Sequence, residues 1–186
     1  MLDENYNNSM VRKALSEIVH QMYEDGLKDE YFVMEAVSHT LGGVCTKSTT
    51  QEDRIKHVDF WWESPKKGLV GIDVKGIKRN NRKDDKLDDS IHWVEVQSVN
   101  GNKGWIYGEA SYIAFRTFKN VIFVKNTTLQ KLSEDIVKTK ELVFRNPKEC
   151  YVPYQRWGRK DIVFKIPTED LIKMSDFIID CEKEAQ

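Results

Sequence analysis

The chain has 186 residues, with 40% hydrophobic and 32% charged residues and a formal net charge of −1. This composition indicates a globular chain with a core of its own and excludes the disordered and fibrous classes. Because the net charge is close to zero, a nucleic-acid-binding surface would have to be a local feature. We expect one domain over residues 1–186.

The cysteines, the N-terminal residues and the apolar runs indicate the compartment in which the protein acts. Cys45, Cys150 and Cys181 are far apart and show no metal-binding spacing, which predicts a reducing, cytoplasmic environment. The N-terminal residues are acidic and polar, unlike a secretory signal. No apolar run approaches the ~20 residues of a transmembrane helix, so we expect no membrane partner.

In chain order, the first part of the sequence has helical periodicity. It predicts helices over 9–23 and 30–41, the second ending at a Gly-Gly pair, with an interruption over 24–30 between them and a polar loop over 44–56.

Strand-forming sequences dominate the rest of the chain. Strands are predicted over 57–63, 68–77, 91–99 and 161–167, with one or two more within 111–126 and a charged loop over 78–90. Capped helices are predicted over 127–140 and 168–185. This order favours an α/β fold with a single mixed β-sheet flanked by helices.

One strand carries a carboxylate and an ammonium side by side. Residues two apart in a strand point to the same face, so Asp73 and Lys75 emerge together while Ile72 and Val74 face apolar packing. If the strand that contains Asp59 pairs with this one, two carboxylates lie together and repel each other unless a cation joins them. Carboxylate oxygens favour Mg²⁺ or Mn²⁺, and a metal beside a lysine suits phosphodiester hydrolysis.

The Asp-x-Lys spacing alone has little specificity. Asp84 and Lys86 share this spacing but lie in a charged run without apolar neighbours, which indicates a solvated loop. For Asp73 and Lys75 the alternative is a salt bridge on an exposed face of the sheet.

The motif in its context resembles the PD-(D/E)xK nuclease superfamily, which has a restriction-endonuclease-like core. That pattern has an acidic residue on a helix, an Asp on an early strand, and (D/E)-x-K on the next strand. Here Glu35, Asp59 and Asp73-Val74-Lys75 occur in that order, and the resemblance covers about residues 30–125. The segment "EVQSVNGNKGWIYGEASYIAFRT" is similar to stretches of small phage-type nucleases, which favours a phage or mobile-element member acting in a bacterial or phage-infected host cell.

The resemblance implies roles for these residues. Asp59 and Asp73 would bind Mg²⁺ or Mn²⁺, with the Val74 carbonyl as a third ligand, and Lys75 would serve the attacking water. Glu35 would bind a second metal, directly or through water; its alternative is a surface helix glutamate. Glu95 and Gln97, two apart on the following strand, would complete the site, unless they lie on a solvent-facing edge.

Two segments combine basic residues in a way that suits DNA. Arg and Lys contact phosphates, and aromatic side chains stack on unpaired bases. The first segment contains Lys78 and Arg79, and the second, "YVPYQRWGRKD", contains Arg156, Arg159 and Lys160. An ordinary solvated loop is the alternative for both.

The sequence therefore predicts a metal-dependent deoxyribonuclease with DNA as its partner. Of the two modes of cleavage, endonucleolytic cleavage is favoured. Small nucleases of this fold commonly dimerise, so the resemblance also raises a homodimer. The alternatives are a non-catalytic nucleic-acid-binding protein on the same fold and a structural or inhibitory phage protein in which Asp73 and Lys75 form a salt bridge.

Overall fold

The structure, a computed structural model, describes residues 24–79 and 86–181. The predicted helix over 9–23 and the middle of the charged loop, including Asp84, lie outside these residues. A helix occupies residues 24–41. The elements that follow are β1 (Val44–Lys47), α2 (Thr50–Lys56), β2 (Phe60–Ser64), β3 (Gly68–Lys75), β4 (Ile91–Gln97), the 3-10 turn η1 (Trp105–Tyr107), β5 (Tyr112–Arg116), β6 (Asn120–Lys125), α3 (Asn126–Thr139), β7 (Tyr154–Gln155), β8 (Ile162–Pro167), α4 (Thr168–Met174) and β9 (Phe177–Asp180).

The main sheet has six strands in the order β1-β2-β3-β5-β6-β9. β3 and β5 run parallel, whereas the other neighbours are antiparallel, so the sheet is mixed. The predicted α/β fold with a mixed sheet and flanking helices is confirmed. Within the described ranges, no helix is long and apolar enough to cross a membrane.

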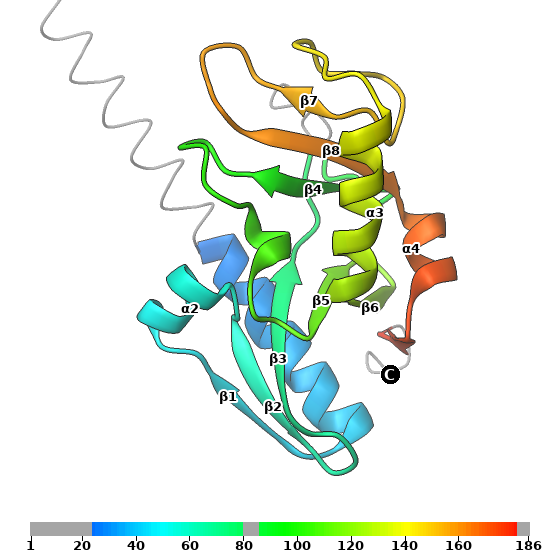
Figure 1. Cartoon of the computed structure of the whole chain (residues 1–186). Coiled ribbons are helices and arrows are strands. Elements are labelled where there is room, and N and C mark those ends of the chain that lie inside the picture. The colour runs from blue at the N-terminus through cyan, green and yellow to red at the C-terminus, as the bar shows by residue number, and fades with distance from the viewer. Residues whose placement is uncertain (1–23, 80–85, 182–186) are drawn as a thin grey trace, which may run out of the picture.

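A second, antiparallel sheet has three strands in the order β4-β8-β7. β4 follows β3 in the sequence but leaves the main sheet and pairs with β8 instead. Figure 1 shows the smaller sheet at one end of the larger one, with α3 running past both. The two sheets thus bring residues from the two halves of the chain together.

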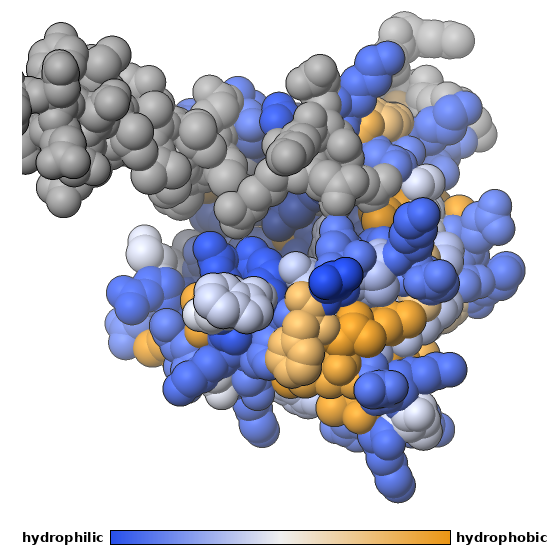
Figure 2. Space-filling model, turned by 90° about the horizontal axis from the view of Figure 1, so that it is seen from above, coloured by the Kyte–Doolittle hydropathy of each residue, from blue (hydrophilic) through white to orange (hydrophobic). Residues whose placement is uncertain are grey.

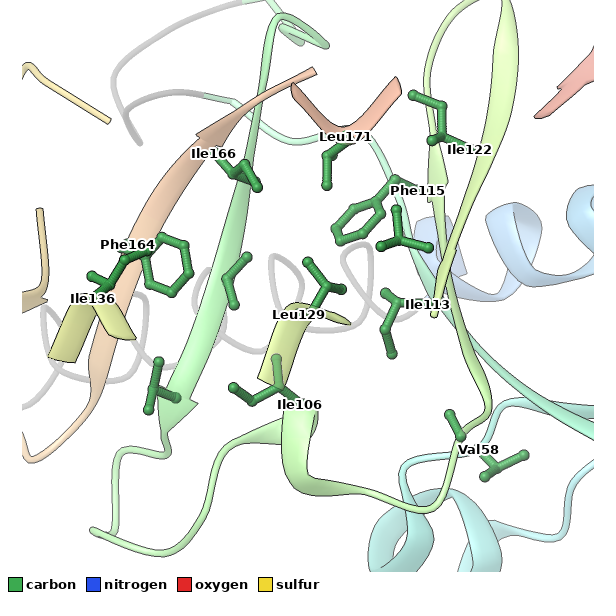
Figure 3. Packing of buried hydrophobic residues seen from close by; sticks show 14 residues of the cluster. Val58, Ile106, Ile113, Phe115, Ile122, Leu129, Ile136, Phe164, Ile166 and Leu171 are labelled. Carbon is green, nitrogen blue, oxygen red and sulfur yellow. The ribbon is translucent and has the colours of Figure 1, made fainter. Parts of the chain in front are cut away.

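Hydrophobic cores cover both faces of the main sheet. On one face, Val70, Ile72 and Val74 of β3 pack in a cluster with the helix over 24–41. The other face packs against the second sheet, α3 and α4 through a cluster of fourteen buried residues, which Figure 3 shows. Because side chains alternate along β3, Asp73 faces this second side of the sheet.

The N-terminal part contains more regular structure than its sequence predicts. Residues 24–30, the predicted interruption, are helical, and the predicted loop over 44–56 contains β1 and α2. α2 has no buried residue, so hydrophobic periodicity cannot reveal it. A capping box between Thr49 and Glu52 defines its start instead.

The C-terminal prediction of one helix over 168–185 is wrong. α4 ends at Met174, and β9 then pairs antiparallel with β6. Phe177 stacks on Phe123 with 4.4 Å between ring centroids, and Ile179 is buried, so this segment is stabilised by tertiary contacts. The caps predicted for α3 and α4 are also wrong, because no side chain caps either helix.

Candidate functional site

Asp59 and Asp73 converge at the open end of the β2–β3 hairpin, opposite its turn. The backbone N–H of Asp59 donates to the carbonyl of Ile72 at 2.9 Å, which fixes Asp59 one residue before β2. An Asp59 carboxylate oxygen accepts the N–H of Val74 at 2.6 Å. Both aspartates are buried, with exposed fractions of 7% and 2%. The predicted pairing of the two strands thus brings the carboxylates together.

Lys75 lies beside this pair of carboxylates. Its ammonium donates to Oδ1 of Asp73 at 2.5 Å and lies 4.6 Å from the ring centroid of Trp105 in η1. The other oxygen of Asp73, Oδ2, is buried and has no hydrogen-bond partner. The expectation that Asp73 and Lys75 share one face is confirmed, but the pair lies in a largely buried position.

The buried charges shift one another's pKa. Burial raises the pKa of Asp73 to about 8; the Lys75 ammonium opposes this shift, and the nearby carboxylate of Asp59 adds to it. Burial alone would lower the pKa of Lys75, but the charges of Asp73 and Asp59 raise it above its ordinary value. With both carboxyls ionised the site would have a surplus of negative charge that Lys75 alone does not neutralise, so Asp73 holds a proton at neutral pH.

The arrangement fits a hard divalent cation. Mg²⁺ is commonly held by one or two carboxylates, with water and substrate phosphate as its other ligands. Two buried carboxylates and the unpartnered Oδ2 of Asp73 supply such a partial ligand set. The Val74 carbonyl points to the same side of β3 as the N–H that Asp59 accepts, because both groups of one strand residue face the same neighbour. No set of three His, Cys, Asp or Glu ligands gathers among residues 24–79 and 86–181.

Glu95 reaches the site from the second sheet, whereas Gln97 does not. Glu95 is near enough to Lys75 for its charge to raise the pKa of that ammonium. Burial raises the pKa of Glu95 in turn, while Lys75 opposes this shift. The side chain of Gln97 donates to the backbone carbonyl of Lys160 instead. The pairing of β4 with β8 shifts register between Glu95 and Gln97, and the two side chains have different partners.

Glu35 is not brought to the two aspartates. It lies on an exposed position of the helix over 24–41, and its charge is not among those that shift the pKa of Asp73 or Lys75. The side of this helix that meets the sheet carries Asp29, which is paired with Arg116 and lies against Gly76. A metal-binding role for Glu35 stays a prediction without a contact to support it.

The basic residues predicted to bind DNA have different surroundings. Lys78 and Arg79 are exposed just beyond β3, and Lys78 is within electrostatic range of Lys75 and Glu95. Arg156 forms an ion pair with the fully buried Asp161, which gives it a structural partner. Arg159 and Lys160 are exposed. The second basic segment therefore contains two residues available to a ligand and one engaged in the fold.

Two titratable residues near Asp59, Asp53 and His57, were not among the predicted site residues. Burial raises the pKa of Asp53, and the charge of Asp59 adds to this shift. Burial and the charge of Lys75 lower the pKa of His57, which ends α2 in a left-handed conformation with φ 51°. Asp53 was missed because its segment was predicted to be a loop. The Thr49-x-x-Glu52 capping signal would have placed Asp53 on a helix that leads directly into Asp59.

Comparisons of this chain with protein-family models, with curated proteins and with solved structures found no match.

Proposed function

We propose that this protein is a metal-dependent deoxyribonuclease that hydrolyses phosphodiester bonds at the Asp59–Asp73–Lys75 site. The observation that carries this proposal is the unpartnered, buried Oδ2 of Asp73 next to a second carboxylate. A buried carboxylate without a full set of partners is unfavourable, and a cation between Asp73 and Asp59 would satisfy both. The order of Asp59, Asp73 and Lys75 in two paired strands also supports the resemblance to PD-(D/E)xK nucleases.

Asp59 and Asp73, with the Val74 carbonyl, would hold Mg²⁺ or Mn²⁺. When bound, the metal polarises the phosphoryl oxygens and lowers the pKa of a coordinated water. Asp59 is already oriented for this role, because the Val74 N–H fixes one of its oxygens. Lys75 is oriented by Asp73 on one side and by the Trp105 ring on the other.

Lys75 would act on the reacting groups in two ways. Its ammonium is held in a position with 20% side-chain exposure, where it stays charged and is shielded from much of the solvent. From there it positions a water molecule and stabilises the negative charge that develops on the phosphoryl oxygens. Glu95 and Lys78, which lie within electrostatic range of Lys75, extend the charged surroundings towards the second sheet.

A plasmid-nicking assay with Mg²⁺ tests this proposal. Wild-type protein should convert supercoiled DNA to nicked or linear forms, and Asp73→Ala and Lys75→Ala should each lose on the order of 10²-fold or more in rate. Lys86→Ala is the matched control, because Lys86 is the lysine of the other Asp-x-Lys sequence and is exposed. Equal cleavage rates for wild type, Asp73→Ala and Lys75→Ala would refute the assignment of the site.

A non-catalytic nucleic-acid-binding protein is the second candidate, and the existing Asp73–Lys75 ion pair favours it. In that case the ion pair is structural and the protein binds DNA equally well in Mg²⁺ and in EDTA without cleaving it. Binding of DNA together with failure of metal binding would select this candidate.

A further inference from the structure

The turn between β7 and β8 holds a tryptophan in solvent. Trp157 is 91% exposed, more than any other large hydrophobic residue in the described part of the chain. By contrast, Trp62 is buried, and Trp61, Trp93 and Trp105 are partly covered. Burial of an exposed indole against a partner surface is favourable, and the side chain loses little conformational freedom when it is buried.

The turn that holds Trp157 is fixed at both ends. The N–H of Arg159 donates to the carbonyl of Arg156 at 3.0 Å, and Gly158 has φ 72°, as a type II turn requires at its third position. Trp157 occupies the second position, so its side chain projects away from the strands. The Arg156–Asp161 ion pair fixes one end, and the bond from Gln97 to the Lys160 carbonyl fixes the other.

The chemistry around this tryptophan suits a nucleic acid. Arg159 ends the turn, Lys160 follows it, and both are exposed, so two positive charges lie within three residues of Trp157 in the sequence. Figure 2 shows hydrophilic side chains over much of the face seen from above, around a hydrophobic patch near its centre. An aromatic ring flanked by cations is the arrangement by which proteins stack on bases and hold the adjoining phosphates.

Charge interactions connect the turn to the candidate site. Arg156 and Asp161 act on Glu95, and Glu95 acts on Lys75. β4, which carries Glu95, is the neighbour of β8, whose first residue follows Asp161. The turn and Glu95 thus belong to the same three-stranded sheet, and Glu95 lies within electrostatic range of Lys75.

We propose that Trp157 stacks on an unpaired base and that Arg159 and Lys160 hold the adjoining phosphates. Bases within continuous duplex are already stacked on both faces, so this contact requires single-stranded or branched DNA. The cleavage part of this inference rests on the proposed function: the nuclease would then prefer DNA with unpaired nucleotides beside the scissile bond. The binding part does not need the metal site.

Binding measurements in EDTA test the inference apart from catalysis. Fluorescence anisotropy should be measured with a labelled single strand, a Y-shaped DNA and a continuous duplex, for wild type, Trp157→Ala and Trp157→Phe. Trp157→Ala should weaken binding to the single strand and to the Y-shaped DNA on the order of tenfold or more, and binding to duplex by less than about twofold. Trp157→Phe should retain most of the affinity, since its ring still stacks.

Phe144→Ala is the matched control, because Phe144 is another exposed aromatic residue, 59% exposed, outside this turn. It should bind all three DNAs like wild type. The inference is overturned if wild type binds none of the DNAs, if Trp157→Ala binds the single strand like wild type, or if it loses affinity for duplex equally. If the stacking effect is seen but no DNA is cleaved in Mg²⁺, the proposed nuclease activity fails while the stacking contact stands.

Discussion

Two buried carboxylates in this protein, Asp73 and Asp161, have similar local partners and different wider surroundings. Each pairs with one basic side chain, Lys75 or Arg156, and each keeps one oxygen without a hydrogen-bond partner. The guanidinium of Arg156 donates twice to the same oxygen of Asp161, through Nε and Nη2. Lys75 offers Asp73 a single contact, and Asp59 adds a second negative charge.

This difference separates a structural carboxylate from a candidate ligand. A guanidinium that donates twice to one oxygen balances the charge of a single carboxylate and fixes its position. If both carboxylates were ionised, one ammonium would leave a net negative charge in a buried place, and burial together with the charge of Asp59 therefore raises the pKa of Asp73 to about 8. We infer that Asp161 stabilises the fold of the β7–β8 turn and that Asp73 is placed to bind a cation.

The largest expected effect is on cleavage. Asp73→Asn should lower the cleavage rate on the order of 10²-fold or more, because the neutral amide can no longer help to hold the metal. Asp161→Asn should cleave at a rate within a few-fold of wild type. Nicking assays on both variants check this. If Asp161→Asn lost cleavage while Asp73→Asn kept it, the two assignments would have to be exchanged.

The second expected effect concerns stability, for which Asp161→Asn should be the more harmful of the two substitutions. Asp161→Asn should lower the free energy of unfolding by about 1.5–3 kcal/mol, since it removes a charged hydrogen-bond acceptor from Arg156. In EDTA at neutral pH, Asp73→Asn should be as stable as wild type or more so, because Asn resembles the protonated form of Asp73. Urea denaturation of the two variants and wild type measures both values. A larger stability loss for Asp73→Asn would indicate that the Asp73–Lys75 ion pair is structural.

A third prediction concerns pH. Because the pKa of Asp73 is raised in the folded state, its contribution to stability is complete at low pH and is lost as pH rises to about 8. In EDTA, wild type should therefore lose stability between pH 6.5 and pH 8.5, and Asp73→Asn should lose less. This range avoids His92, whose pKa burial lowers to about 4. Parallel pH curves for the two proteins would contradict the assignment of the buried charge.

The smallest expected effect concerns the basic turn. Replacing both Arg159 and Lys160 with Ala should weaken DNA binding and reduce the slope of log affinity against log salt by about one to two. Arg156 is left intact here, because its pairing with Asp161 makes its loss a stability change as well. Binding titrations at several salt concentrations measure the slope. A slope equal to that of wild type would show that these two side chains do not contact phosphates.

Residues that build the centre of the site were predictable because local rules determine them. Period-two alternation in an apolar run places Asp73 and Lys75 on one face. A short connection makes β2 and β3 a hairpin, so the chain returns and brings Asp73 beside Asp59. Strand-forming residues also dominate positions 57–77, so no helical periodicity competes with the strand prediction there.

Contributions from distant parts of the chain were not predictable in the same way. The departure of β4 from the main sheet depends on its pairing with β8, so the approach of Glu95 to Lys75 depends on a contact far along the chain. α2 buries no residue, so its periodicity gives no signal and Asp53 was overlooked. Glu35 follows the motif order, but the rotation of its helix places it in solvent.

The most direct test of the central claim is divalent-cation binding by calorimetry, with Mg²⁺ and Mn²⁺ titrated into wild type, Asp73→Asn, the Asp59→Asn, Asp73→Asn double variant and Asp161→Asn. Wild type and Asp161→Asn should bind either ion, Asp73→Asn should bind it much more weakly, and the double variant should not bind. Equal binding by wild type and the double variant, or no binding by wild type, would contradict the account.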